Sequence, residues 1–201
     1  MELDKIGGGL YAKVYAHGKF PVVLKKTYAS DPWFRYANWV LSRRGRKTPG
    51  QQFLPEIFSM HTDSDLNTAN VLAMMKRYKT TVSKLLRRSG DQLVKSKTLP
   101  FMEKHFNLTP AQKDNWQQTA QNLYEAFSCF HACMSRWDAA RKFNLRNFNG
   151  YRPKKSIKDL VCFLRYLAKN STKTSFFPND VHCGNLMVDE QYNLVLTDPS
   201  S

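Results

Sequence analysis

Three side chains near the end of this 201-residue sequence have the types and the spacing that phosphoryl transfer needs. Asp180 and Asn185 are five positions apart, and Asn185 and Asp198 are thirteen apart. In such a trio, one carboxylate orients an acceptor hydroxyl and accepts its proton. An amide oxygen and a second carboxylate hold Mg²⁺ against the phosphates. The alternative is that these residues only cap turns; two further motifs in the expected order favour the phosphoryl-transfer interpretation.

The first of these motifs is a glycine run near the N-terminus. Gly7, Gly8 and Gly9 are followed by Ala12 and Val14, which fits the pattern G-x-G-x-x-G-x-V with alanine at the third glycine. Glycines let backbone N–H groups approach phosphate closely because no side chain intervenes. Taken alone, the run is equally consistent with a flexible hairpin.

The second motif is a lysine on a short apolar strand. In Val22-Val23-Leu24-Lys25, residues Val23 and Lys25 share one strand face, so Lys25 can point into a cleft and neutralise phosphate oxygens. An edge-strand lysine is the alternative, and Lys26 is a second candidate for the role.

The elements that would position these residues follow from periodicity. We expect strands at 10–15 and 21–25, a helix at 32–42, a strand pair at 57–60 and 70–78, a long helix opening at Thr109-Pro110, a helix at 156–169, and strands at 186–188 and 194–197. The predicted fold class is α+β. One domain (1–201) would form a compact bilobal structure, with a small antiparallel β-lobe (1–78) and a mainly helical lobe (79–201). A cleft between two such lobes is where a ligand is expected.

Charge and hydropathy limit the partners. The formal net charge of +15 favours nucleotides, acidic proteins or nucleic acid, although a basic surface that only aids solubility is an equal alternative. We expect no contact with a membrane, because no segment has the length of apolar sequence that a spanning helix needs. Together with the lack of a signal-peptide pattern, this predicts a cytoplasmic protein.

These motifs resemble the protein-kinase-like superfamily in its small bacterial and viral branch. The run Asp180-Val181-His182-Cys183-Gly184-Asn185 followed by Thr197-Asp198-Pro199 is similar to the early serine/threonine protein kinases of short-tailed coliphages (the autographivirus type). So are the glycine loop, the Val-x-Lys strand and the stretch from Pro49-Gly50 to Phe58. The resemblance is dense at the two ends of the chain, whereas residues 79–175 match by helical character alone.

The resemblance implies a role for each motif. Asp180 would be the catalytic base, Asn185 and Asp198 the Mg²⁺ ligands, and Lys25 the residue that binds the α- and β-phosphates of ATP. Gly7, Gly8, Gly9, Ala12 and Val14 would cover the phosphates, and the segment 74–77, with Met75, would lie beside adenine. If the enzyme is phage-encoded, its substrates would be host proteins and its location the host cytoplasm.

Two features depart from the family pattern. The strand lysine of a kinase pairs with a helix glutamate, but the only acid between Lys25 and Gly50 is Asp31, which is better interpreted as a helix cap. Pro199-Ser200 replaces Phe-Gly after the metal-binding Asp, so we expect no activation-loop regulation. Two alternatives therefore remain beside a protein kinase: a pseudokinase that binds and inhibits a host factor, and a small-molecule phosphotransferase.

Overall fold

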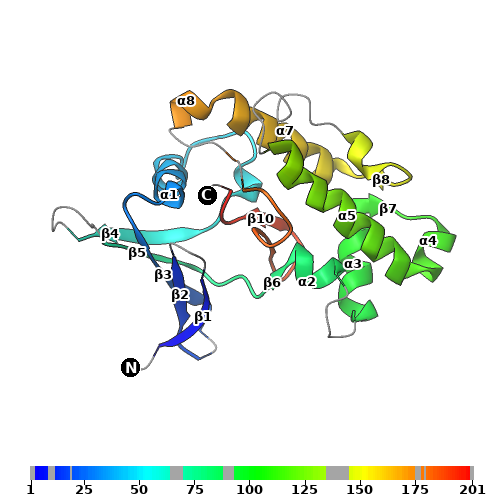
Figure 1. Cartoon of the computed structure of the whole chain (residues 1–201), viewed down its shortest axis with the longest axis horizontal. Coiled ribbons are helices and arrows are strands. Elements are labelled where there is room, and N and C mark those ends of the chain that lie inside the picture. The colour runs from blue at the N-terminus through cyan, green and yellow to red at the C-terminus, as the bar shows by residue number, and fades with distance from the viewer. Residues whose placement is uncertain are drawn as a thin grey trace.

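The computed structural model describes residues 3–8, 12–18, 20–63, 70–87, 93–134, 145–174, 178 and 180–199. Within these ranges the chain is α+β, as predicted, with an antiparallel five-stranded sheet on one side and most of the helices on the other (Figure 1). The strands are β1 (Asp4–Gly8), β2 (Lys13–Ala16), β3 (Val22–Tyr28), β4 (Ile57–Thr62), β5 (Asn70–Lys76), β6 (Thr80–Thr81), β7 (Phe106–Asn107), β8 (Arg152–Pro153), β9 (Leu186–Val188) and β10 (Leu194–Leu196). The helices are α1 (Pro32–Ser42), α2 (Val82–Leu86), α3 (Lys95–His105), α4 (Pro110–Asp114), α5 (Trp116–Met134), α7 (Lys155–Lys169) and α8 (Ser171–Thr174), with short 3₁₀ helices at Gln51–Phe53 and Leu145–Phe148.

The large sheet has the strand order β1-β2-β3-β5-β4. Its first strand was not predicted, because β1 is polar and glycine-rich and exposes every residue to solvent. The central strand β3 alternates between buried and exposed residues along its second half, which places Val23, Lys25 and Thr27 on the covered face. Val14 of β2 and Ala73 of β5 flank Lys25 in register.

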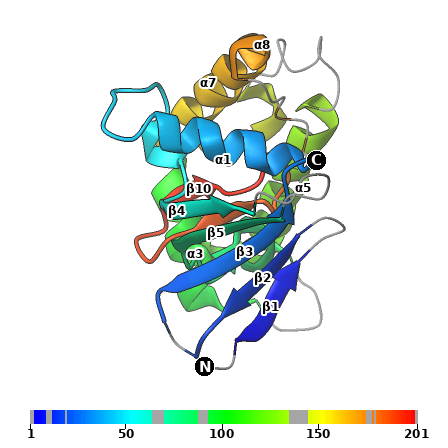
Figure 2. The ribbon, with the colours of Figure 1, turned by 90° about the vertical axis from the view of Figure 1, so that its left-hand side faces the viewer.

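Helix α1 has the predicted boundaries and crosses the covered face of the sheet (Figure 2). Asp31 caps it by accepting a hydrogen bond from the Trp33 backbone N–H at 2.9 Å, and Pro32 occupies the first turn, where its missing N–H costs nothing. Trp33, Tyr36 and Ala37 are fully buried on one side of the helix. Helix α1 therefore joins the sheet to the rest of the molecule.

The long helix predicted from Thr109-Pro110 is two helices. Thr109 and Gln112 form a capping box that starts α4, but Asn115 leaves the helical conformation and α5 begins one residue later. Apolar residues recur at spacings of three and four from Trp116 to Trp137 in the sequence, which predicts one buried stripe. Ala120, Leu123 and Phe127 of this stripe are fully buried, as predicted, whereas Trp137 lies outside the described residues. Periodicity alone could not reveal the break, because α4 buries none of its residues and the buried apolar residues begin only in α5.

Helix α7 confirms the prediction at 156–169 and packs close to the segment that follows α1. Gly50 lies here with φ of 74°, and a β-carbon at this position would collide with the Phe163 ring. Only glycine fits both the conformation and the contact. Helices α2 and α3 were not predicted, because α2 is short and Pro100 lies inside α3.

The predicted strands near the C-terminus form an antiparallel hairpin, in which Leu186 pairs with Leu196 and Val188 with Leu194. This hairpin of β9 and β10 continues onto β6 in a three-stranded sheet, and all three residues of β10 are buried. In Figure 1 the hairpin lies at the middle of the molecule, between the large sheet and α5. None of the described helices is long and apolar enough to cross a membrane.

Candidate active site

Lys25 is the lysine of β3 that points into the molecule. Its side chain is 7% exposed, and its Nζ donates to Asp198 Oδ2 at 2.7 Å, across 173 positions of sequence. The neighbouring Lys26 is exposed, as the period of a strand requires. Of the two lysines weighed from the sequence, only Lys25 is in a position to act on a ligand held at Asp198.

Asp180 and Asn185 are held together as one loop. The Asn185 side-chain amide donates to both the backbone carbonyl and Oδ2 of Asp180, each at 2.9 Å. The backbone N–H of Asp180 in turn donates to the Pro199 carbonyl at 2.9 Å, which ties the loop to the residue after Asp198. The Asp180 side chain remains 24% exposed, so one edge of its carboxylate is open to the cleft.

His182 shapes this loop. Its Nδ1 accepts a hydrogen bond from the Gly184 backbone N–H at 2.9 Å, so the neutral ring carries its proton on Nε2, which faces Asp180 Oδ1 at 3.7 Å. A β-carbon on Gly184 would lie 2.6 Å from the ring, so glycine is needed there for the histidine to fold back. His182 therefore holds the loop between Asp180 and Asn185 in this conformation.

The hairpin accounts for the thirteen-residue spacing. The backbone N–H and the hydroxyl of Thr197 both donate to the Asn185 carbonyl at 3.1 Å. Asn185 leads into β9 and Asp198 follows β10, so the two strands and their turn bring the ends of the interval back to one place.

The donor set around Asp198 fits a hard divalent cation. Its Oδ2 accepts from Lys25, whereas its Oδ1 is buried without a hydrogen-bond partner among the described residues. Burial raises the pKa of the Asp198 carboxyl, and Asp31 and Asp180 add to this, while the Lys25 ammonium lowers it. Since the Asn185 amide nitrogen is committed to Asp180, the Asn185 oxygen is the atom left to bind. An unpaired carboxylate oxygen and an amide oxygen are ligands that Mg²⁺ accepts.

These two residues alone would not enclose an ion. The described residues contain no cluster of three or more His, Cys, Asp or Glu side chains arranged to hold a metal. A Mg²⁺ ion at Asn185 and Asp198 would therefore take its other ligands from water and phosphate oxygens, as Mg²⁺ commonly does with nucleotides.

A cleft of about 670 Å³ brings the predicted site together. Its lining includes every predicted site residue that the structure describes: Gly7, Gly8, Ala12, Val14, Lys25, Met75, Asp180, Asn185 and Asp198. Gly9 lies outside the described residues. The volume is in the usual range for a small-molecule site.

The cleft also has lining residues that sequence reasoning missed. Trp33 lies on α1, Lys79 lies between β5 and β6, and Lys84 lies on α2. Trp33 gave no signal beyond its place after a capping aspartate and a proline. No sequence pattern distinguishes the two lysines from the other basic residues of the chain.

Asp31 does not replace the missing helix glutamate. Its two carboxylate oxygens accept from the Trp33 backbone N–H and from the Thr27 hydroxyl, so it acts as the predicted cap. Lys25 instead contacts Asp198 and the ring of Trp33, with Nζ 4.0 Å from the ring centroid.

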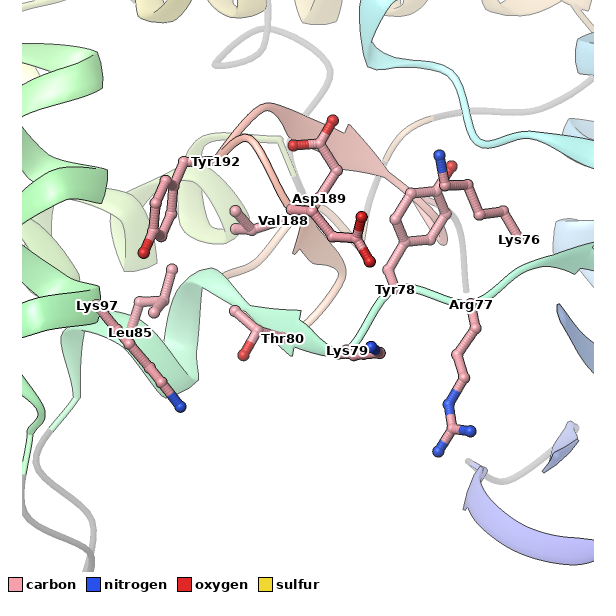
Figure 3. Close-up of a pocket in the computed structure, with 11 residues that line it drawn as sticks. Lys76, Arg77, Tyr78, Lys79, Thr80, Leu85, Lys97, Val188, Asp189 and Tyr192 are labelled. Atoms are coloured by element: carbon pink, nitrogen blue, oxygen red, sulfur yellow. The ribbon is translucent and has the colours of Figure 1, made fainter. Parts of the chain in front are cut away.

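A second, smaller pocket of about 210 Å³ lies on the other side of the linker between β5 and β6 (Figure 3). Tyr78, Thr80, Val188 and Tyr192 form much of its wall, and Lys97 extends along its rim. It contains none of the predicted catalytic or metal-binding residues, so the larger cleft is the candidate active site.

No protein-family model matches the chain. A search of curated proteins gives no match either.

Proposed function

We propose that this chain is a Mg-ATP-dependent serine/threonine protein kinase with a bilobal, protein-kinase-like fold, whose active site is the cleft of about 670 Å³. The observation that carries the proposal is the convergence of Lys25, Asp180, Asn185 and Asp198, from two distant parts of the sequence, on one cleft that the glycine strand also lines. Residues that only cap turns would not be expected to lie around a buried lysine.

The proposed mechanism assigns each side chain one task. Gly7 and Gly8 lie along the cleft without side chains and so allow the phosphates to approach the backbone. Lys25 neutralises the α- and β-phosphate oxygens. Asn185 and Asp198 would hold Mg²⁺, which would supply charge neutralisation at the phosphates. Asp180 orients the acceptor hydroxyl. As the hydroxyl oxygen bonds to the γ-phosphorus and the bond to the ADP oxygen breaks, Asp180 accepts the hydroxyl proton.

The charge of the cleft favours a protein substrate over a cationic small molecule. Four basic residues beside Lys25 line it, whereas the trio contributes only two carboxylates; the four are Lys76, Arg77, Lys79 and Lys84. An aminoglycoside-type phosphotransferase needs acidic groups around a polycationic substrate. The resemblance to early phage kinases makes host proteins the expected substrates.

The missing helix glutamate is the observation that favours a pseudokinase. Transfer of radiolabelled γ-phosphate from Mg-ATP into proteins of a bacterial lysate distinguishes an active kinase from a pseudokinase. We expect the wild-type protein to label protein bands and Asp180→Ala and Asp198→Asn to abolish the labelling, with a loss of about 10²–10⁴-fold for the base. Asp159→Ala is the matched control, since Asp159 pairs with Lys155 on the surface of α7.

The outcomes are distinct. Labelling that survives both active-site variants would show that the activity does not come from this cleft. A folded wild-type protein that binds Mg-ATP but labels nothing, itself included, would be a pseudokinase.

A further inference from the structure

We propose that Trp33 takes the place of the absent helix carboxylate and positions Lys25 for the phosphates; this rests on the proposed nucleotide site. Trp33 is a positioning residue in this scheme, because it acts through Lys25. The two groups differ in chemistry, because the face of the Trp33 ring is neutral and a carboxylate is an anion.

The contact of Trp33 with Lys25 is the first support. The Lys25 ammonium lies 4.0 Å above the centre of the indole ring, and Trp33 is fully buried. An ammonium over an aromatic face is attracted by the negative charge of that face, most strongly for tryptophan and where water is excluded. The geometry thus fixes the lysine without neutralising it.

The second support is a hydrogen bond on the edge of the same ring. The indole Nε1 donates to the Thr197 backbone carbonyl at 2.9 Å. Thr197 precedes Asp198, so one side chain contacts the lysine with its face and the metal-binding segment with its edge. A helix glutamate would serve only the lysine.

The backbone around Trp33 keeps the ring in place. Asp31 accepts from the Trp33 N–H and also from the hydroxyl of Thr27, which lies two positions after Lys25 on the same face of β3. Strand β3 and the start of α1 are therefore linked through Asp31, and the ring and the lysine that it supports are anchored to the same capping group.

This arrangement matters when the nucleotide binds. Asp198 is the anionic partner of Lys25 among the described contacts, and in the proposed site it also holds Mg²⁺. When phosphates and Mg²⁺ compete for both members of that pair, the ring remains as the support of Lys25. The ammonium can then turn to the phosphates with its full charge, because the indole does not compete as an anion would.

The test uses two ligands that differ in phosphate. Binding of the non-hydrolysable ATP analogue AMP-PNP with Mg²⁺, and of adenosine, is measured by calorimetry on the whole chain. We expect Trp33→Leu to weaken AMP-PNP about tenfold to thirtyfold, the value of a desolvated cation–π contact, and to leave adenosine within about twofold. Trp33→Phe, which keeps a ring face, should recover part of the AMP-PNP affinity.

Trp39→Leu is the matched control. Trp39 lies on the same helix and is also buried, but its ring stacks on Phe163, away from the cleft. This variant should lose stability and keep the wild-type ratio of the two affinities. If Trp33 had only a structural role, Trp33→Leu would also keep the wild-type ratio of the two affinities, as Trp39→Leu does. That result would overturn the inference.

A fluorination series keeps the test decisive if Trp33→Leu does not fold. Fluorinated tryptophans introduced at position 33 alone retain the shape and the N–H while withdrawing charge from the ring face. AMP-PNP affinity should fall stepwise with each fluorine and adenosine affinity should not. Constant AMP-PNP affinity across the series would refute the inference alone, whereas a wild-type protein that binds neither ligand would refute the proposed function and the inference with it.

Discussion

Each end of the β9–β10 hairpin is held by hydrogen bonds from aromatic side chains to backbone carbonyls, but the donor groups at the two ends differ. At the end that carries Asp198, Trp33 donates to the Thr197 carbonyl at 2.9 Å and Tyr36 donates to the Leu196 carbonyl at 2.6 Å. At the turn end, His105 Nε2 bonds to the Tyr192 carbonyl at 2.8 Å. Each anchor is a buried aromatic donor on a helix that reaches a backbone oxygen.

The donors differ in how they respond to pH. Indole does not titrate, and burial raises the pKa of Tyr36 well above its ordinary value, so both donors at the Asp198 end keep their protons. At the turn end, burial lowers the pKa of His105 to about 4. The end that holds the site residues is therefore anchored by groups that do not change with pH, whereas the structural end can be loosened by acid.

The two ends of the hairpin also differ in how the carboxylate of their aspartate is hydrogen-bonded. Asp198 leaves one carboxylate oxygen without a hydrogen-bond partner among the described residues, whereas Asp189 uses its carboxylate to cap the turn. Asp189 accepts from the backbone N–H groups of Gln191 and Asn193 at 2.9 and 2.7 Å, and from the Asn193 side chain at 2.8 Å. A satisfied carboxylate stabilises structure, whereas an unsatisfied one is available to a ligand.

The largest effect on activity should come from Asp198→Asn, compared with the same substitution at Asp189. We expect Asp198→Asn to lower phosphotransfer about a thousandfold, because the metal supplies several kcal/mol of transition-state stabilisation. Asp189→Asn should leave the rate unchanged and cost about 1 kcal/mol of unfolding free energy through its weakened turn. Labelling assays and urea denaturation on both variants measure this. Equal effects of the two variants on the rate would remove the distinction between the ends.

The pH dependence of stability tests the turn end. The neutral His105 accepts from Ser156 at Nδ1 and donates to Tyr192, and the pKa is 6.5 in the unfolded chain and about 4 in the folded one. Because the folded pKa is the lower one, stability from this group is complete above pH 6.5 and is lost as the pH falls towards 4. We expect a loss of about 3 kcal/mol in unfolding free energy over that interval.

Urea denaturation at several pH values measures the effect of His105. The control is His105→Gln, which cannot take up a proton; it should be less stable at pH 7 but show a flatter profile between pH 6.5 and 4. A variant that loses stability in acid as steeply as the wild type would show that another group is responsible.

The smallest effect should come from Tyr36→Phe at the site end. It removes one hydrogen bond, to Leu196, and leaves the ring packing intact, so we expect a cost of about 1 kcal/mol. The cost should be the same at pH 5 and pH 8, because the phenol stays protonated throughout. A cost that changes between these two values, in the same denaturation experiment, would contradict the contrast between the two ends.

Much of the site could be predicted because its residues lie in local patterns. The alternation of β3 distinguishes Lys25 from Lys26, the Asp31-Pro32 pair defines the start of α1, and the hairpin explains how Asn185 and Asp198 meet. The boundaries of α1 followed from its cap, and those of α7 from apolar periodicity. These features depend on neighbours within a few positions, which a single sequence displays.

What could not be predicted depends on contacts between distant parts of the chain. Trp33 gains its position from Lys25 and Thr197 together, and no local pattern distinguishes it from Trp39, which is also buried. Strand β1 gave no apolar alternation, since it is exposed throughout. Helix α4 buries none of its residues, so no apolar periodicity marks the break at Asn115. In each case tertiary pairing decides a structure that local sequence leaves open.

The place of Trp33 has an optical consequence. Indole emission responds to the electric field across the ring, and here an ammonium lies 4.0 Å from the ring centre. Any ligand that draws Lys25 towards itself alters that field, so the emission of Trp33, one of four tryptophans in the sequence, should change, whereas Trp39 is stacked on Phe163 away from the cleft. The protein thus contains its own fluorophore at the point where a phosphate would arrive.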